Sequence, residues 1–314
     1  MISYENGLTI KQLNEFDKEG CLCLPNFLSA EQVEELLCHS KELLNDMDLS
    51  NHPMTKFTTG ETLNEKHIGD EYFLESSDKI SYFFEPDAFN KEGELIKAKE
   101  KSINKIGHSL HTKDEKFNKI TMKDSRIQKI ARQLKFVDPR VLQSMLIFKQ
   151  PEIGAKVPSH QDGVFLYTKP LSAIGFWFAL ENCSQKNGCL SYNPGSHKTF
   201  PIKKRFVKVD KGRSGCNIVS INEIENRKEG KEDEDEEEIK DKDMDEDYKF
   251  VECKAGSLIL IHNSVLHKSE PNLSEESRYA YTFHVIDCNC EYDELNWLQV
   301  PPSEDGGTDF AKLY

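Results

Sequence analysis

The sequence predicts a mainly β protein with flanking α-helices, a single domain over residues 1–314 in which helices come first and an antiparallel sandwich or barrel follows. Two helical patterns stand before residue 50, whereas from Val141 onward the apolar segments are short and separated by Gly, Pro, Asn and Ser. Of the 314 residues, 37% are hydrophobic and 10% are aromatic, so the chain can enclose a sizeable core.

The first part of the chain, residues 1–140, is expected to be mostly helical. The segment LTIKQLNEF predicts a helix and CLCLPNF a short strand; a second helix follows, with Ser29 as its N-cap and Gln32 at the capping-box position. From His52 to about Asn90 the chain is polar and irregular, apart from a strand candidate at KISYFFE. A further helix is expected over about 125–134.

The β-core is expected over residues 141–300. Its strand candidates are VLQSMLIFKQ, GVFLYT, AIGFWFALE, GCLSYNP, SLILIHN and RYAYTFHVID. Because alternate residues of a strand point to opposite faces, Trp177 must face away from Phe176 and Phe178. The pattern leaves open which of the two sets packs the core and which lines a cavity.

An acidic segment, residues 222–247 (NEIENRKEGKEDEDEEEIKDKDMDED), interrupts the β pattern. Like charges repel one another and leave little to bury, so this insertion is expected to be solvated and disordered. Its acids do not follow the order of an EF-hand calcium loop. An alternative function for the insertion is contact with a basic partner.

Charge and terminal sequences exclude several classes of function. The formal net charge of −14 gives no electrostatic reason to bind nucleic acid or an anionic membrane. There is no apolar run long enough to span a membrane, no secretory signal at the start, and FAKLY at the end is not a peroxisomal address. The nine cysteines form no C-x-x-C pair, so reduced thiols in a cytoplasmic protein are expected.

The segment SHQDGVFLYTKP places His160 and Asp162 two residues apart. In an extended segment, side chains at i and i+2 leave the backbone on the same side, so both can bind one metal ion. A third ligand from a distant strand would complete a 2-His-1-carboxylate triad, the arrangement of non-heme Fe(II) oxygenases.

The third ligand has three candidates, His262, His267 and His284. His267 is preferred because Arg278 follows it by eleven residues, and an antiparallel pair of strands would bring these two side chains close together. An arginine fork there can bind the far carboxylate of a dicarboxylic keto acid. His262 and His284 are expected to pack nearby or support the ligands.

These motifs resemble the phytanoyl-CoA dioxygenase family of Fe(II)/2-oxoglutarate oxygenases. The resemblance is carried by KSINKIGHSLH, QSMLIFKQP, HQDGVFLYT, NGCLSYNPGSHK, LIHNSVLHKS, RYAYTFH and LNWLQ, and it spans roughly residues 10 to 300 apart from the acidic insertion. It implies a double-stranded β-helix (jelly-roll, cupin-like) core. It also implies the iron ligands His160, Asp162 and His267, which with Arg278 form the catalytic set.

The resemblance further implies which residues contact 2-oxoglutarate: Lys105, Met145, Gln161, Trp177, Ser269 and Arg278, beside the iron ligands His160, Asp162 and His267. Lys105 and Met145 rest on the resemblance alone.

The activity implied by the family is a 2-oxoglutarate-dependent dioxygenase. It would use Fe(II), 2-oxoglutarate and O₂, with ascorbate as a stimulant, to hydroxylate a C–H bond while releasing succinate and CO₂. The substrate is expected to be a small or lipid-like molecule, with acyl-CoA esters included. The alternative is a catalytically silent jelly-roll protein that binds a metal or ligand. No H-E-x-x-H, G-x-S-x-G or G-x-G-x-x-G motif supports another enzyme class.

Overall fold

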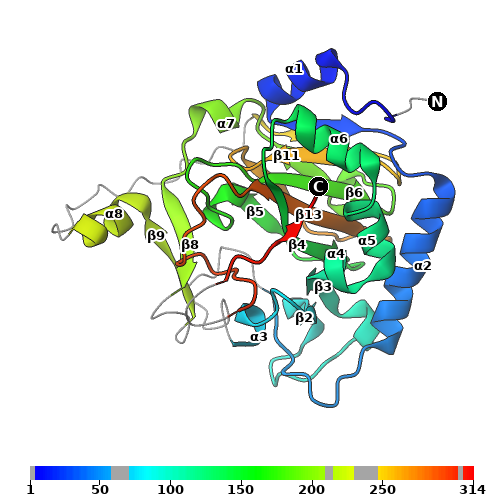
Figure 1. The fold of residues 1–314 in the computed structure, drawn as a ribbon. Coiled ribbons are helices and arrows are strands. Elements are labelled where there is room, and N and C mark those ends of the chain that lie inside the picture. Colours follow the sequence, from blue (N-terminus) through cyan, green and yellow to red (C-terminus); the bar gives the residue numbers. More distant parts are fainter. Residues whose placement is uncertain (1–3, 58–70, 209–214, 230–246, 303–306) are drawn as a thin grey trace.

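The computed structural model describes residues 4–57, 71–208, 215–229, 247–302 and 307–314 (Figure 1). The helices are α1 (Ile10–Glu19), α2 (Ala30–Asp46), α3 (Glu71–Leu74), α4 (Leu110–Lys113), α5 (Glu115–Thr121), α6 (Ser125–Gln133), α7 (Ser196–Thr199) and α8 (Ile221–Glu229). The strands are β1 (Cys21–Leu24), β2 (Ile80–Phe84), β3 (Ile103–His108), β4 (Pro139–Ile147), β5 (Val157–His160), β6 (Ile174–Ala179), β7 (Leu190–Tyr192), β8 (Lys204–Lys208), β9 (Cys216–Ser220), β10 (Lys249–Phe250), β11 (Leu258–His262), β12 (His267–Ser269), β13 (Ala280–Asp287) and β14 (Ala311–Lys312).

The main sheet has eight antiparallel strands in the order β1-β11-β6-β13-β4-β3-β2, with β14 added beside β4. Residues directly opposite one another across a sheet share a face. One such row crosses six strands through Cys23, Ile259, Trp177, Thr282, Met145 and Gly107. The row therefore places the side chains of Trp177 and Met145 on one face of the main sheet.

The minor sheet, in the order β10-β7-β12-β5, packs against that face. Trp177 and Ile259 of the main sheet share one apolar cluster with Cys189, Leu190 and Val251, which lie on or beside the minor sheet. Two antiparallel sheets that enclose a common interior form a jelly roll, which confirms the predicted fold class.

The opposite face of the main sheet is covered by helices, and this answers the question left open by the strand pattern. Phe176 and Phe178 belong to a large core with Leu36 and Leu44 of α2 and with Phe117 of α5. Trp177 therefore faces the interior between the sheets. In Figure 1, α2 runs along one edge of the molecule, while α8, β8 and β9 lie at the opposite edge.

Helix starts follow the local chemistry of the sequence. Ser29 accepts a hydrogen bond from the backbone N–H of Gln32, and the Gln32 side chain accepts from the backbone N–H of Ser29, which confirms the predicted capping box. Thr9 and Gln12 make the same pair of bonds at the start of α1.

Two predictions about the strands are wrong. The sequence places the start of the β-core at residue 141, yet β1, β2 and β3 also join the main sheet, so the core begins well before that residue. Strands β1 and β2 match the predicted strand candidates CLCLPNF and KISYFFE, and helices still make up most of the regular structure before residue 139. The sequence also predicts a strand at GVFLYT, where the chain instead makes a 3₁₀ turn over Asp162–Val164. The backbone N–H groups of Phe165 and Leu166 both donate to the Asp162 carbonyl, so hydrogen bonding within the turn replaces strand pairing.

The acidic insertion is not disordered at its start, because residues 221–229 form α8. Ile224 is buried there, and Glu225 pairs with Lys169 at 2.8 Å, which gives this segment a side chain to pack and an ion pair. Residues 230–246 of the predicted insertion lie outside the described residues.

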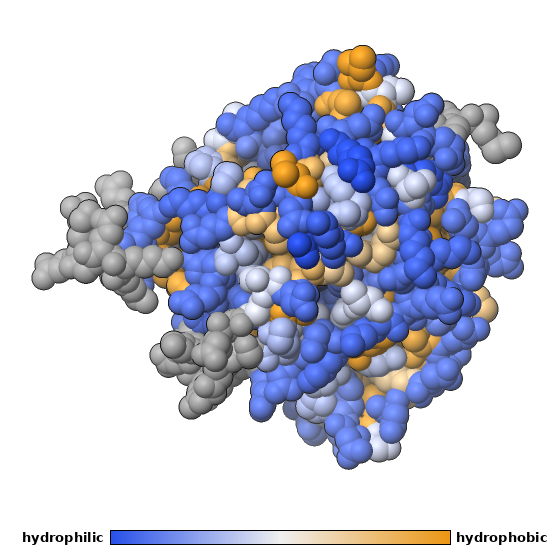
Figure 2. All heavy atoms as spheres, in the orientation of Figure 1, coloured by the Kyte–Doolittle hydropathy of each residue, from blue (hydrophilic) through white to orange (hydrophobic). Residues whose placement is uncertain are grey.

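The nine cysteines are free; Cys21, Cys183 and Cys189 are buried, Cys38 is exposed and the others are partly buried. Figure 2 shows a face that is largely hydrophilic, with hydrophobic atoms in small separate groups. In the described ranges, no helix combines the length and the apolar character that crossing a membrane would require.

Replacing Phe283 by alanine should strongly destabilise the fold. Phe283 is fully buried and stacks on Phe176 with ring centroids 4.9 Å apart, so truncation leaves a cavity and should lower the free energy of unfolding by about 3–5 kcal/mol. Urea denaturation measures the change. The control, Leu273→Ala, alters an exposed side chain and should stay within about 0.5 kcal/mol of wild type. Equal effects of the two substitutions would contradict the assignment of this core.

Candidate metal centre

The predicted H-x-D pair lies where β5 ends. His160 is the last residue of β5, and Asp162 opens the 3₁₀ turn that follows. The turn brings the carboxylate back toward the imidazole, with 3.6 Å between Nε2 of His160 and Oδ1 of Asp162. The two side chains converge as predicted, although the segment is not extended through Asp162.

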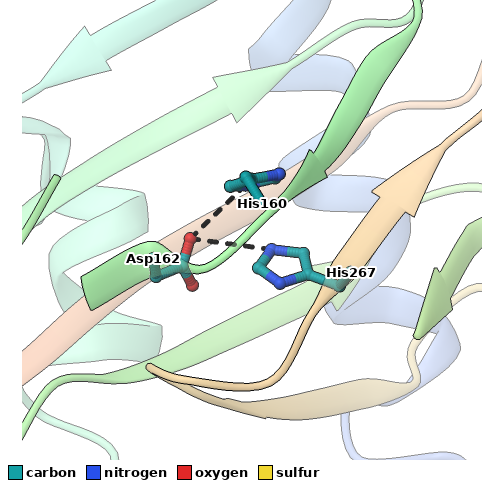
Figure 3. A group of neighbouring side chains, drawn as sticks. All are labelled: His160, Asp162 and His267. Carbon is teal, nitrogen blue, oxygen red and sulfur yellow. Dashed lines mark ion pairs between the residues drawn. The ribbon is translucent and has the colours of Figure 1, made fainter. Parts of the chain in front are cut away.

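His267 completes the group from the neighbouring strand, β12. It lies opposite His160 in the minor sheet, and the two imidazole centroids are 4.2 Å apart. Nε2 of His267 is also 3.6 Å from Oδ1 of Asp162. One ligand atom from each of the three residues lies within 4.8 Å of the others, and Figure 3 shows the side chains converging.

Backbone carbonyls fix how the two histidines face this point. Nδ1 of His160 lies 2.8 Å from the carbonyl of Pro158, and Nδ1 of His267 lies 3.0 Å from that of Val265. Because a carbonyl only accepts, each Nδ1 carries the proton and donates it. Each Nε2 then keeps a free lone pair for a metal ion.

Asp162 is held by a third histidine that is not a ligand. Oδ2 of Asp162 lies 3.2 Å from Nε2 of His284, while Oδ1 faces His160 and His267. Nδ1 of His284 in turn lies 3.4 Å from the side-chain amide nitrogen of Gln143. His284 thus orients the carboxylate, the supporting role expected for it.

Gly175 on β6 leaves the room that this arrangement needs. A Cβ added there would lie 3.3 Å from Nε2 of His284 and 3.5 Å from Oδ2 of Asp162. The carboxylate and the supporting imidazole therefore lie almost directly on the backbone of the main sheet.

The protonation states suit a metal site. Burial lowers the pKa of His267 to about 4, with a further decrease from the charge of His160, so His267 is neutral at pH 7. Burial alone would raise the pKa of Asp162, but the surrounding histidines outweigh burial and hold that pKa well below its ordinary value. A neutral His267 and an ionised Asp162, together with the imidazole of His160, match the 2-His-1-carboxylate donor set of a non-heme Fe(II) centre.

Arg278 lies across the interior from the triad's strands. The sequence predicts that its strand pairs with that of His267, and this is wrong, because β12 belongs to the minor sheet and β13 to the main sheet. Arg278 is 2% exposed, and its Nε and Nη1 have no hydrogen-bond partner in the part of the chain that the structure describes. Its guanidinium lies 5.1 Å from the ring of Trp177. A buried guanidinium with free donors is well suited to bind a carboxylate.

The other residues implied by the family occupy different positions. Trp177 and Met145 share the interior row of the main sheet, and Ser269 is buried in the minor sheet. The Gln161 amide donates to the carbonyls of Phe200 and Ser264, so it anchors the backbone beside the ligands.

Lys105 is buried in β3, with its Nζ 3.2 Å from the centroid of the Phe57 ring. Lys105 lies opposite Ile147 of β4, and Ile147 lies opposite Ala280 of β13. Ile147 is two residues from Met145 on β4, so both side chains lie on the same face of the sheet. Lys105 therefore faces the same interior as Met145. Burial lowers its pKa to about 7, although the charge of Glu85 raises it.

One polar residue in this interior was not among those predicted from the sequence. Lys149 is 2% exposed and donates to Oγ of Ser269 at 2.7 Å. It follows an apolar strand in the segment FKQP, where a lysine is ordinarily solvated, so nothing in the local sequence indicated its burial.

His262 and His197 contact each other rather than the triad. Their ring centroids are 4.8 Å apart, and His262 also packs against Phe16 at 6.3 Å. His197 lies in α7, and its Nε2 contacts the carbonyl of Asp17 at 2.9 Å.

Comparison with protein families finds a match over residues 16–280 to the family described as phytanoyl-CoA dioxygenase (PhyH). A phytanoyl-CoA dioxygenase domain-containing protein 1 homolog of Caenorhabditis elegans is 41% identical, over 91% of this chain and 93% of that protein. The family member of this name is also the one that the sequence motifs indicate, and this comparison confirms the resemblance.

Solved structures share the fold at much lower sequence identity. Iron-bound EctD from S. alaskensis is 16% identical, with a TM-score of 0.60 over 100% of this chain and 90% of that one. The epimerase SnoN in complex with Fe3+, alpha ketoglutarate and nogalamycin RO is 15% identical, with a TM-score of 0.57 over 97% of this chain and 98% of its own.

Replacing His284 by phenylalanine should weaken metal binding without removing a ligand. The Asp162 carboxylate would lose the donor on Oδ2 and rotate more freely, which should lower metal affinity by about 10–100-fold. Titration with Mn(II), followed by the change in thermal unfolding temperature, measures the affinity. Asp162→Ala, which removes a ligand, sets the limit of full loss. Wild-type affinity in the His284 variant would show that the carboxylate is positioned without it.

Lys105 should make the stability of the metal-free protein rise with pH. Its pKa is about 7 when folded and about 10.5 when unfolded, so between these values the unfolded chain binds more protons and folding gains about 1.4 kcal/mol per pH unit. The loss of unfolding free energy caused by burying Lys105 is complete below pH 7 and disappears near pH 10.5. The difference in unfolding free energy between wild type and Lys105→Met, measured at pH 7 and pH 9.5, should shrink accordingly. A difference independent of pH would contradict the depressed pKa.

Proposed function

The chain belongs to the phytanoyl-CoA dioxygenase family and is a 2-oxoglutarate-dependent dioxygenase, and we propose that it hydroxylates a C–H bond of a small or lipid-like substrate. The observation that carries this proposal is the triad of His160, Asp162 and His267 in the same interior as the unpartnered guanidinium of Arg278. The triad would hold Fe(II), and the guanidinium would bind the co-substrate.

Bound iron, with 2-oxoglutarate and O₂, supplies the oxidising chemistry that converts a C–H bond to C–OH and releases succinate and CO₂. The residues of this chain bind, orient and shield. His160 and His267 present their Nε2 lone pairs because Pro158 and Val265 hold the opposite ring nitrogens. His160, Asp162 and His267 would supply three ligands to the iron, which would leave positions for the co-substrate and O₂.

Arg278 selects a dicarboxylate in this proposal. A keto acid can chelate a metal ion through one end, and its second carboxylate then needs a partner at the other end. The Nε and Nη1 groups of Arg278 are two donors with no partner among the described residues, and burial strengthens their bonds to an anion. Trp177 packs beside the guanidinium and shields it from water.

The substrate class is supported by the rings beside the ligands. Phe165 lies 6.1 Å from His160 by ring centroids, Phe206 lies 5.5 Å from Phe165, and Trp297 lies 6.5 Å from Phe206. Phe206 and Trp297 are buried in one apolar cluster, and Phe165, partly buried against that cluster, is the ring that adjoins a ligand. An aromatic ring in this position would favour an apolar group that presents its C–H bond to the iron. An acyl-CoA ester falls within this class. We place the reaction in the cytoplasm and expect ascorbate to stimulate it.

Purified wild-type protein with Fe(II) and O₂ should convert 2-oxoglutarate to succinate slowly, even without the primary substrate. His267→Ala should abolish the conversion, because two ligands cannot hold the iron as three do. Arg278→Met should raise the KM for 2-oxoglutarate by at least about tenfold, because a charge-assisted contact is lost. Succinate detected by mass spectrometry is the measurement.

The matched control is Arg132→Met. Arg132 lies on helix α6 with its guanidinium against Tyr314, and that helix packs into the core on the face of the main sheet opposite the interior. It should leave turnover unchanged. If neither wild type nor control forms succinate and neither binds 2-oxoglutarate, the protein is a silent binding protein and the proposal is wrong.

A further inference from the structure

Lys149 is a buried cation that the proposed reaction leaves without a role. Its Nζ donates to the carbonyl of Ala155 at 2.9 Å and to Oγ of Ser269 at 2.7 Å. Its own carbonyl accepts from the backbone N–H of Arg278 at 3.3 Å. Lys149 therefore connects Ser269 of the minor sheet with Arg278, which lies just before β13 of the main sheet. Both residues are implied to bind 2-oxoglutarate.

Two glycines make room for the Lys149 side chain. A Cβ added at Gly188 would lie 2.4 Å from Cε of Lys149, and one added at Gly154 would lie 2.8 Å from Cγ. Lys149 also has a positive φ of 36°, in a region that side-chain-bearing residues seldom adopt. The strained backbone and the close contacts with the two glycines restrict where the Lys149 ammonium group can lie.

The bond to Ser269 determines what that hydroxyl can do. In its ammonium form Lys149 only donates, so Oγ of Ser269 then accepts from Lys149 and the hydroxyl proton must point elsewhere. No other hydrogen bond of this hydroxyl is present within the described part of the chain. Ser269 is 2% exposed, so the free O–H is a buried donor aimed into the interior.

The surroundings of Lys149 disfavour its positive charge, so an anion bound nearby would stabilise it. Burial lowers the pKa of Lys149 well below its ordinary value, and the neighbouring charge of Arg278 lowers it further. The buried acid that acts on Lys149 most strongly is Glu85, whose pKa is itself raised by burial. A carboxylate placed beside Arg278 would offset this repulsion and favour the ammonium form of Lys149.

We propose that Lys149 is a positioning residue for the far carboxylate of 2-oxoglutarate: it directs the Ser269 hydroxyl toward that carboxylate and adds a second positive charge beside Arg278. This inference rests on the proposed function, since it assigns the carboxylate at Arg278 to the co-substrate. The alternative role for Lys149 is a structural link to the loop at Ala155.

The two roles predict different selectivity. Lys149→Met keeps most of the stem and removes the donors, so the KM for 2-oxoglutarate in succinate formation should rise about tenfold or more, with a much smaller change in kcat. 2-Oxovalerate has the same chelating end but a methyl group instead of the far carboxylate. Its inhibition constant against 2-oxoglutarate should change by less than about twofold. A structural role would weaken both acids together.

A binding measurement that needs no turnover accompanies the kinetics. With Mn(II) in place of iron, 2-oxoglutarate should raise the thermal unfolding temperature of wild type and of the exposed-lysine control Lys254→Met equally. The rise should be much smaller for Lys149→Met. A variant that binds 2-oxoglutarate as tightly as wild type overturns the inference, and a wild type that does not bind it overturns the proposed function instead.

Ser269→Ala keeps the test decisive if Lys149→Met fails to fold. If Lys149 acts through the hydroxyl, Ser269→Ala should itself raise the KM for 2-oxoglutarate. Adding Lys149→Met to Ser269→Ala should then raise this KM by a smaller factor than Lys149→Met does in the wild type. Wild-type KM in a folded Ser269→Ala protein would overturn the inference.

Discussion

The packing of the minor sheet against the main sheet is the constraint on which the site depends. His160 and His267 lie on the minor sheet, whereas Trp177 lies on the main sheet and Arg278 just before its strand β13. Neither sheet alone holds both the metal ligands and the guanidinium. Asp162 joins the two layers directly, because its carboxylate faces the minor-sheet histidines through one oxygen and His284 of β13 through the other. The helices act at a distance, by burying the other face of the main sheet and holding it in shape.

The sequence was most informative where the chemistry is local. Ser29 and Gln32 stand three residues apart and cap their own helix, and the spacing of His160 and Asp162 indicated a shared target. What could not be predicted depends on contacts between distant segments. Hydrophobic alternation does not say which strands pair, so β12 and β13 were expected side by side although they belong to different sheets. The turn after His160 has the composition of a strand, yet the bonds to the Asp162 carbonyl determine its shape.

Charge is distributed in the interior in a way that folding alone does not favour. Arg278 and Lys149 are almost fully buried, and burial lowers the pKa of both groups. Removing cations from water destabilises the native state unless a partner compensates for the lost hydration. The extensive apolar core on the helical side supplies the stability that tolerates this arrangement. Burying these two cations thus lowers the free energy of unfolding below what the core alone would give. A bound dianion would restore part of that free energy.

Gly175 shows how a residue with no functional group can restrict a site. Most positions in β6 can exchange one apolar side chain for another of similar volume, since a packed interior tolerates such swaps. At position 175 the available space is already taken by the imidazole of His284 and the carboxylate of Asp162. A methyl group there would require the His284 imidazole to shift by a few tenths of an ångström, and any larger side chain would require more. Among random variants that retain metal, the diversity at position 175 should therefore be narrower than at the other positions of β6, so that a survey of tolerated substitutions would mark it as part of the centre.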